Sequence, residues 1–196
     1  MVVRVDVVAR AFEEVYGIPA RKVREERRVL VTEPGGRYVE QGYVRELAEE
    51  ISGSRGLAMV CGRYGGMDER VRDVLATEAV SLGDFVLSGG EIVAAALSDA
   101  VIRLLGGVLG NSESLVGESF SCEGSIGPPQ YTRPSAWDGE EVPAVLLSGN
   151  HAEIQAWRER EARERAEART ERRNEAEEGP RFVSGAPDNT HERRQT

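Results

Sequence analysis

Apolar and polar residues recur along this chain with two different periods, and the period changes from segment to segment. A spacing of three to four residues, typical of one buried helix face, predicts helices over 4–17, 38–51 and 91–105. Short apolar runs at 28–32 and 57–61 instead predict buried strands. Strands that alternate with helices favour an α/β fold with a mainly parallel sheet and helices on both faces.

The other segments of the first 150 residues are less regular. The charged stretch 67–77 predicts a short helix, and 79–90 predicts a strand, a turn and a second strand-like run. Residues 106–140 hold many Gly, Ser and Pro residues, and such stretches are commonly functional or disordered. The run PAVLLSG at 143–149 predicts a last strand.

The C-terminal part changes character after Trp157. Asn150 is placed to cap a helix that begins at His151. Residues 158–178 hold seven Arg and eight Glu, which predicts a solvated helix with charge pairs four residues apart. Residues 179–196, which contain Gly, Pro, Asn and Thr, are predicted to be disordered.

Length and composition limit the class of protein. A chain of 196 residues has room for one domain and an appendage. Its net charge of -9 argues against a protein that coats nucleic acid generally, but it leaves a local basic site open. No stretch is long and apolar enough to span a membrane, and the charged N-terminus does not resemble a signal peptide.

Cysteine and histidine are scarce. Cys61 and Cys122 are too few for a disulfide framework and predict reduced thiols in a cytoplasmic protein. With two histidines and no CxxC motif, no metal site is predicted from the residues.

Glycine-rich segments follow three of the predicted strands: EPGG at 33–36, CGRYGG at 61–66 and LSGGE at 87–91. The carboxyl ends of parallel strands meet at one edge of a sheet, where ligands bind. Glycine lets backbone N–H and C=O groups approach a ligand closely, so the three loops are able to enclose an adenosine-like cofactor. Tight turns without a ligand explain the same glycines equally well. None of the segments matches the GxGxxG or P-loop patterns, which disfavours ordinary dinucleotide or NTP chemistry.

Over about 28–158 the chain carries six motifs in a consistent order: CGRYGGMDERV (61–71), SLGDFVLSGGE (81–91), GVLGN (107–111), ESF (118–120), QYTRP (130–134) and VPAVLLSGNHAEIQAWR (142–158). Together they resemble the bacterial tRNA (guanine-N1)-methyltransferase family. SGGE and YTRP in this arrangement are its most specific parts.

The resemblance implies a SPOUT-class α/β fold with a C-terminal trefoil knot that binds S-adenosylmethionine. It implies methyl transfer to N1 of guanine 37 in tRNA, assisted by Mg2+, by a homodimer. The implied domains are a knotted methyltransferase domain over 1–157, its first strand expected to be missing, and the charged helix 158–178 as a reduced C-terminal domain. The tail 179–196 follows it.

Carried onto this chain, the resemblance places the cofactor in three loops. The implied cofactor-binding residues are Pro34, Gly35, Gly62, Arg63, Tyr64, Gly66, Leu82, Gly83, Phe85, Leu87, Gly89 and Gly90. Leu82 and Leu87 are expected beside the adenine, and Arg133 on the guanine or phosphate side. A surface role before a proline turn is the alternative for Arg133.

Two acidic positions of the family are glycines here. The family carries its general-base Asp in a segment of the form GLLDxPHYTRP, where this chain has GSIGPPQYTRP with Gly127 at that position. Gly65 stands where the family pattern CGRYEG has Glu. The catalytic residue is therefore unassigned. A catalytically impaired SPOUT paralogue that binds cofactor or RNA, and a methyltransferase for another substrate, are the alternatives to the family's activity.

Overall fold

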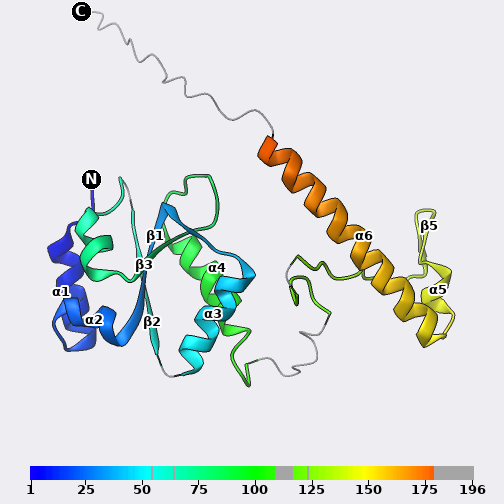
Figure 1. Cartoon of the computed structure of the whole chain (residues 1–196), viewed down its shortest axis with the longest axis horizontal. Coiled ribbons are helices and arrows are strands. Elements are labelled where there is room, and N and C mark those ends of the chain that lie inside the picture. Colours follow the sequence, from blue (N-terminus) through cyan, green and yellow to red (C-terminus); the bar gives the residue numbers. More distant parts are fainter. Residues whose placement is uncertain (54, 64, 109–116, 123, 179–196) are drawn as a thin grey trace, which may run out of the picture. The chain divides into compact units, whose positions relative to one another are not determined.

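The computed structural model describes residues 1–53, 55–63, 65–108, 117–122 and 124–178, and it divides the chain into two compact units (Figure 1). Unit 1 is Met1–Glu113 and unit 2 is Ser114–Thr196. Unit 1 contains the sheet, and unit 2 contains the long C-terminal helix.

The sheet of unit 1 has three parallel strands. They are β1 (Arg27–Tyr38), β2 (Gly56–Cys61) and β3 (Glu78–Ser81), in the order β2-β1-β3. Leu30 of the central strand lies opposite Met59 on one side and Glu78 on the other. This arrangement confirms the predicted parallel sheet.

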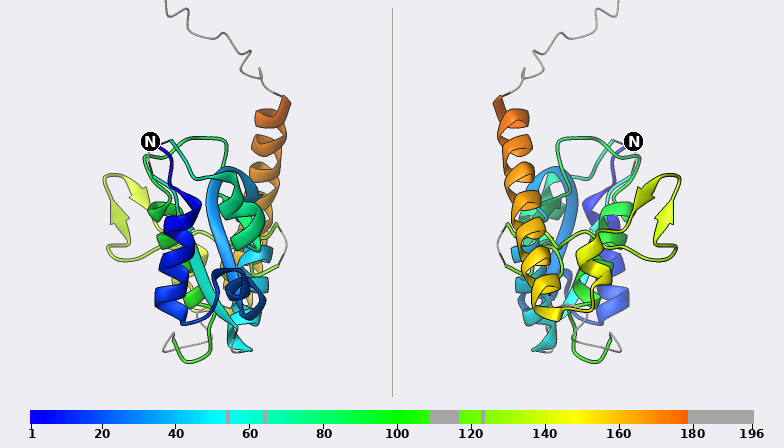
Figure 2. Two further views of the ribbon diagram at one scale, coloured as in Figure 1. Left: turned by 90° about the vertical axis from the view of Figure 1, so that its left-hand side faces the viewer. Right: turned by 90° about the vertical axis from the view of Figure 1, so that its right-hand side faces the viewer.

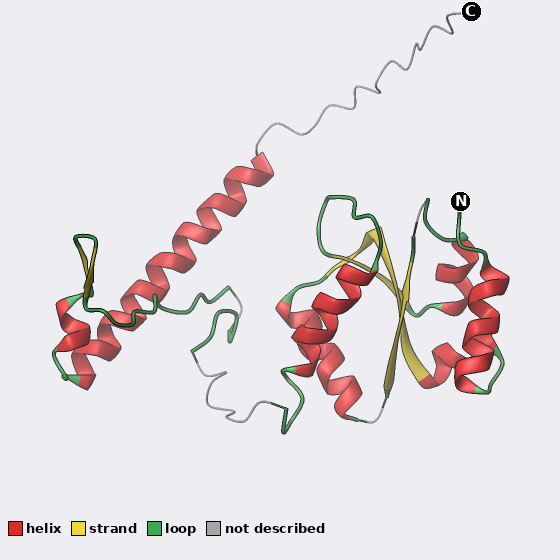
Figure 3. Ribbon diagram, turned by 180° about the vertical axis from the view of Figure 1, so that it is seen from behind, coloured by secondary structure: helices red, strands yellow, loops and turns green. Residues whose placement is uncertain are grey.

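Side chains of β1 alternate between two hydrophobic cores because successive residues of a strand face opposite sides. Val29 and Val31 pack with α1 (Val5–Tyr16), α2 (Ala20–Glu26) and the short π-helix η1 (Val71–Leu75). Leu30 packs with α3 (Gln41–Ser52) and α4 (Glu91–Ile102). The sheet therefore lies between two helical layers (Figure 3), as the apolar pattern predicts.

Three local predictions for unit 1 need correction. The turn predicted at 33–36 is a bulge within β1, which continues to Tyr38 because both sides of the bulge pair with β3. The short helix predicted over 67–77 forms but is shorter, because residues 69–70 are helical and lead directly into the π-helix η1. The strand-like run at 84–87 is a loop.

Unit 2 is built around α6 (His151–Glu178), one continuous helix as its charge pattern predicts. The Asn150 Oδ1 accepts a hydrogen bond from the Glu153 amide at 3.4 Å, so Asn150 caps the helix. Trp157 is 9% exposed and its ring lies 6.2 Å from that of Tyr131. These contacts attach the first turns of α6 to the segment before them.

The strand predicted at 143–149 is wrong. Ala144–Leu147 form the single turn α5, which begins directly after Pro143. A four-residue apolar run fits a helix or a strand equally well by pattern. The strands in the described part of unit 2 are instead the short hairpin β4 (Ala136–Trp137) and β5 (Glu140–Glu141). The predicted disorder of 179–196 lies outside the described residues.

Candidate functional site

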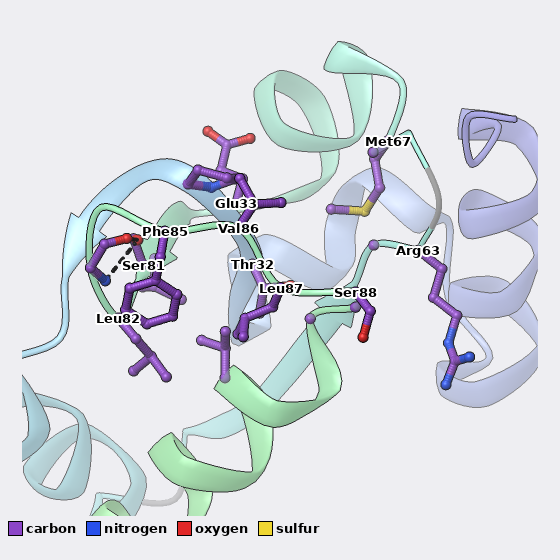
Figure 4. A pocket seen from close by; sticks show the side chains of 18 of the residues that line it. Thr32, Glu33, Arg63, Met67, Ser81, Leu82, Phe85, Val86, Leu87 and Ser88 are labelled. Atoms are coloured by element: carbon purple, nitrogen blue, oxygen red, sulfur yellow. Dashed lines mark hydrogen bonds between the residues drawn. The ribbon is translucent and has the colours of Figure 1, made fainter. Parts of the chain in front are cut away.

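A cavity of about 380 Å³ lies at the carboxyl ends of the three strands of unit 1 (Figure 4). Three segments line it: the bulge of β1, the loop after β2 and the loop after β3. In Figure 4, Leu82 and Phe85 extend from the loop after β3, whereas Arg63 and Met67 come from the loop after β2. The fold therefore brings the three predicted glycine segments to one site.

The bulge of β1 forms one wall of the cavity. Thr32 and Arg37 both lie opposite Val80 of β3, so the four residues between them leave the ladder. Gly36 makes this possible, because a Cβ there would lie only 2.6 Å from the carbonyl carbons of Ala79 and Val80. Close backbone approach at Gly36 positions the bulge against β3.

A second wall is the loop that connects β3 to α4. The amide of Gly90 donates a hydrogen bond to the carbonyl oxygen of Gly62 at 3.0 Å, and Gly89 bridges to Arg63. A Cβ on Gly90 would meet the Thr32 side chain and lie 3.2 Å from the Cα of Cys61. The loop thus crosses from β3 to the end of β2, and it packs there only because Gly90 has no side chain.

The start of the same loop is fixed by Ser81. Its hydroxyl donates to the carbonyl oxygen of Gly83 at 3.1 Å and lies 3.2 Å from the Gly83 amide nitrogen, which donates to it. The ring of Phe85 covers Gly83, since a Cβ on Gly83 would lie 2.8 Å from it. Tyr38 donates a hydrogen bond to Asp84 and holds the loop from outside.

The lining of the cavity suits a ligand with an apolar ring and polar edges. Leu82, Leu87 and Val93 supply aliphatic surface, and the glycines leave main-chain groups accessible. Among the described lining residues the charged ones are Glu33 and Arg63. Arg63 pairs with Glu91 at 2.5 Å, and Glu33 accepts a hydrogen bond from Arg72 at 3.4 Å.

The buried Thr32 side chain lines the cavity, whereas the half-buried Cys61 at the end of β2 does not. Thr32 is 7% exposed, and its hydroxyl makes no hydrogen bond of ordinary geometry within the described residues. Burial, followed by the nearby Glu91 carboxylate, raises the pKa of the Cys61 thiol. The raised pKa favours the protonated thiol over the thiolate at neutral pH.

The structure brings ten of the twelve predicted cofactor residues to this cavity. They are Pro34, Gly62, Arg63, Gly66, Leu82, Gly83, Phe85, Leu87, Gly89 and Gly90. Gly35 belongs to the bulge but does not line the cavity, and Tyr64 lies outside the described residues.

Nine lining residues are not among the twelve predicted cofactor-binding residues, although Glu33, Gly65 and Ser88 lie within the predicted glycine segments. They are Thr32, Glu33, Gly65, Met67, Val80, Ser81, Val86, Ser88 and Val93. Most of these residues are sequence neighbours of a predicted residue near the end of a strand. That position is the signal in the sequence that could have identified them.

Arg133, expected on the guanine or phosphate side, and Gly127, at the family's general-base position, belong to unit 2. Arg133 precedes a cis proline, Pro134, and lines a second cavity of about 310 Å³ with Tyr131 and Arg158. Gly127 donates its amide to Ser119 Oγ at 3.0 Å, and its carbonyl oxygen accepts a hydrogen bond from Arg165 at 3.2 Å. Gly127 therefore contributes backbone contacts and no acid or base.

Within the described ranges there is no group of three or more His, Cys, Asp or Glu residues that could hold a metal ion. In the same ranges, no helix has the length and apolar character needed to cross a membrane.

Comparison with known proteins identifies related sequences. The sequence model of the family described as tRNA (Guanine-1)-methyltransferase TrmD matches residues 1–175. A protein of Geobacter sp. (strain M21), named tRNA (guanine-N(1)-)-methyltransferase, is 47% identical over 165 residues, which cover 84% of this chain and 62% of the relative.

Relatives of the same name in other bacteria match to a similar degree. One from Cereibacter sphaeroides (strain KD131) is 49% identical over 83% of this chain and 63% of its own length. One from Listeria monocytogenes (strain HCC23) is 45% identical over 79% of this chain and 61% of its own length. The chain thus spans about three fifths of the length of these relatives.

Proposed function

The chain belongs to the tRNA (guanine-1)-methyltransferase family, and on this premise we propose that it transfers a methyl group from S-adenosylmethionine to N1 of guanine 37 in tRNA. The observation that carries the proposal is the cavity at the carboxyl ends of β1, β2 and β3. It is built from the loops to which the family resemblance assigns the cofactor.

S-Adenosylmethionine fits the residues that line this cavity. A volume of about 380 Å³ lies within the ordinary range of about 300–1,000 Å³ for small-molecule sites. Leu82 and Leu87 provide apolar contact for the adenine, while main-chain groups near Gly62 and Gly90 provide polar contacts for its edge. Glu33 and Arg63 supply one negative and one positive side chain for the charged methionine part.

The bound cofactor supplies an electrophilic methyl group on a sulfonium. What the protein must add is alignment of donor and acceptor, since correct orientation alone lowers such a barrier by several kcal/mol. The loops are suited to that task because Ser81, Gly36 and Gly90 fix their backbones by short contacts. We propose that the three loops hold the methyl donor in a single orientation.

Methylation at N1 also requires a base, because N1 of guanine carries a proton at neutral pH. Gly127 has no group that accepts a proton. Glu118 and Asp138 are carboxylates near it in the sequence of unit 2. Substitution of each by its amide will show whether either accepts the N1 proton.

The proposal includes further features of the family. They are a trefoil knot in a methyltransferase domain over 1–157, a reduced C-terminal domain at 158–178, a homodimer, a cytoplasmic location and contact of Arg133 with the tRNA. Mg2+ belongs to the expectation from the family, but the described residues offer no ligand cluster for it, so no step is assigned to a metal.

A methyl-transfer assay tests the proposal. Purified protein is incubated with methyl-labelled S-adenosylmethionine and an unmodified tRNA transcript, beside a transcript with adenine at position 37. Label in the guanine transcript only is the expected result. Cofactor binding by calorimetry without transfer would instead indicate an impaired paralogue, and transfer by Gly127→Asp alone would identify the lost base.

A further inference from the structure

Glu33 places a carboxylate at the cavity of unit 1. It is the first residue of the β1 bulge, at the end of the sheet where the loops after β2 and β3 also lie (Figure 2). Its side chain lines the cavity and is 26% exposed. A charge that is partly withdrawn from water is screened less than a fully solvated one. Glu33 is therefore placed to influence which ligands the cavity accepts.

Glu33 shares one guanidinium with two other carboxylates. Arg72 of η1 lies 3.4 Å from Glu33 and 3.2 Å from Asp73, and it also pairs with Glu69. Hydrogen bonds with Asp73, followed by those with Glu33, raise the pKa of Arg72. The three carboxylates outnumber the guanidinium, so this cluster carries a net negative charge.

The positive side chain of the cavity has its own partner. Arg63 pairs at 2.5 Å with Glu91, which does not line the cavity. Figure 4 shows Glu33 and Arg63 at opposite sides of the site. Because Glu91 compensates Arg63 whereas three carboxylates share Arg72, the excess charge beside the cavity is negative within the part of the chain that the structure describes. Such a field favours a ligand with a positive charge.

The family resemblance does not assign this charge. Gly65 lines the same cavity, where the family pattern CGRYEG has Glu. Among the described lining residues the carboxylate is therefore that of Glu33, which lies on a different segment of the chain. A role for Glu33 in ligand choice belongs to the residues of this chain and to none of the family motifs.

The methyl donor and its product differ in charge at one atom. The methyl carbon leaves without the electron pair of its bond to sulfur, so the sulfonium of S-adenosylmethionine becomes the neutral thioether of S-adenosylhomocysteine. On the basis of the proposed function, we propose that the Glu33 carboxylate stabilises the cationic donor and makes the cavity bind S-adenosylmethionine more tightly than S-adenosylhomocysteine. Glu33 is then a specificity-determining residue that favours replacement of the product by fresh donor.

Titration calorimetry of the full chain with three ligands tests this proposal. S-Adenosylmethionine carries the sulfonium, sinefungin carries a protonated amine at the same place, and S-adenosylhomocysteine carries no charge there. Glu33→Gln keeps the shape of the side chain and removes its charge. The substitution is expected to raise the Kd of both cationic ligands about fivefold or more, and to change the Kd of S-adenosylhomocysteine less than about twofold.

Glu69→Gln is the matched control, because Glu69 pairs with the same guanidinium and does not line the cavity. It is expected to leave the ratio of the Kd values for S-adenosylmethionine and S-adenosylhomocysteine within about twofold of the wild-type ratio. If Glu33→Gln weakens all three ligands equally, or leaves the cationic ligands unaffected, the proposal is overturned while the proposed function stands. A wild-type chain that binds no S-adenosylmethionine would overturn both.

Discussion

Gly36 gives the sharpest test of how the fold builds the cavity wall. A Cβ at this position would lie 2.6 Å from two backbone carbonyl carbons of β3, and backbone within a sheet yields less easily than a flexible side chain. Overpacking of this kind costs about 1–3 kcal/mol and occasionally more. Gly36→Ala is therefore expected to lower the free energy of unfolding by at least about 2 kcal/mol, a large share of a typical stability of about 5–15 kcal/mol.

Gly35 is the matched control. It belongs to the same bulge, but the nearest atom to a Cβ there is Glu33 Oε1 at 4.0 Å. Gly35→Ala is expected to change the free energy of unfolding by no more than about 0.5 kcal/mol. Urea unfolding followed by far-UV circular dichroism measures both variants. Equal urea midpoints for the two variants would refute the argument from close backbone approach.

The two variants also differ in their expected binding. Because the bulge carries Glu33 and Pro34 into the cavity, Gly36→Ala is expected to weaken S-adenosylmethionine binding under conditions where the variant remains folded. Calorimetric titration below the unfolding transition checks this, and an unchanged Kd would show that the bulge does not contribute to the site.

Three further predictions concern other parts of the molecule. Glu78 accepts hydrogen bonds from Arg28 at 2.7 Å and from Tyr43 at 2.9 Å. Glu78→Gln should therefore lower the free energy of unfolding in urea by about 1–3 kcal/mol. Hydrogen bonds from the Arg70 side chain and amide lower the pKa of Asp68 to about 2. Ionised Asp68 therefore stabilises the folded state above the unfolded-state pKa of about 3.9, and this stabilisation is lost as the pH falls toward 2. Asp68→Asn should remove this pH dependence from the free energy of unfolding measured between pH 5 and 2. Trp157→Ala should destabilise unit 2 by about 3–5 kcal/mol, and unchanged thermal melting of α6 would contradict the burial of that ring.

Features that depend on local pattern were predictable from the sequence. Helices α1, α3, α4 and α6 follow residue spacing, and Leu30 and Val31 face opposite cores because neighbouring strand residues must. The convergence of the glycine segments was also predictable, because parallel strands end at one edge of the sheet.

Features that depend on contacts between distant residues were not predictable. The pairing of Arg37 with Val80 continues β1 beyond a segment that resembles a simple turn. The hydrogen bond from Gly90 to Gly62 joins residues from two different loops. The run at 144–147 is helical although the sequence predicts a strand there, since four residues are too few for the pattern to distinguish the two. The catalytic base was not predictable either, because Gly127 stands where the family resemblance places that residue.

The central claim is that S-adenosylmethionine binds the cavity at the carboxyl ends of β1, β2 and β3. Hydrogen exchange of the full chain, with and without saturating S-adenosylmethionine, tests it most directly. The account predicts slower amide exchange in 32–36, 61–67 and 81–90 and unchanged exchange along α6. Saturating cofactor that leaves these three segments unprotected, or that protects only other parts of the chain, would contradict it.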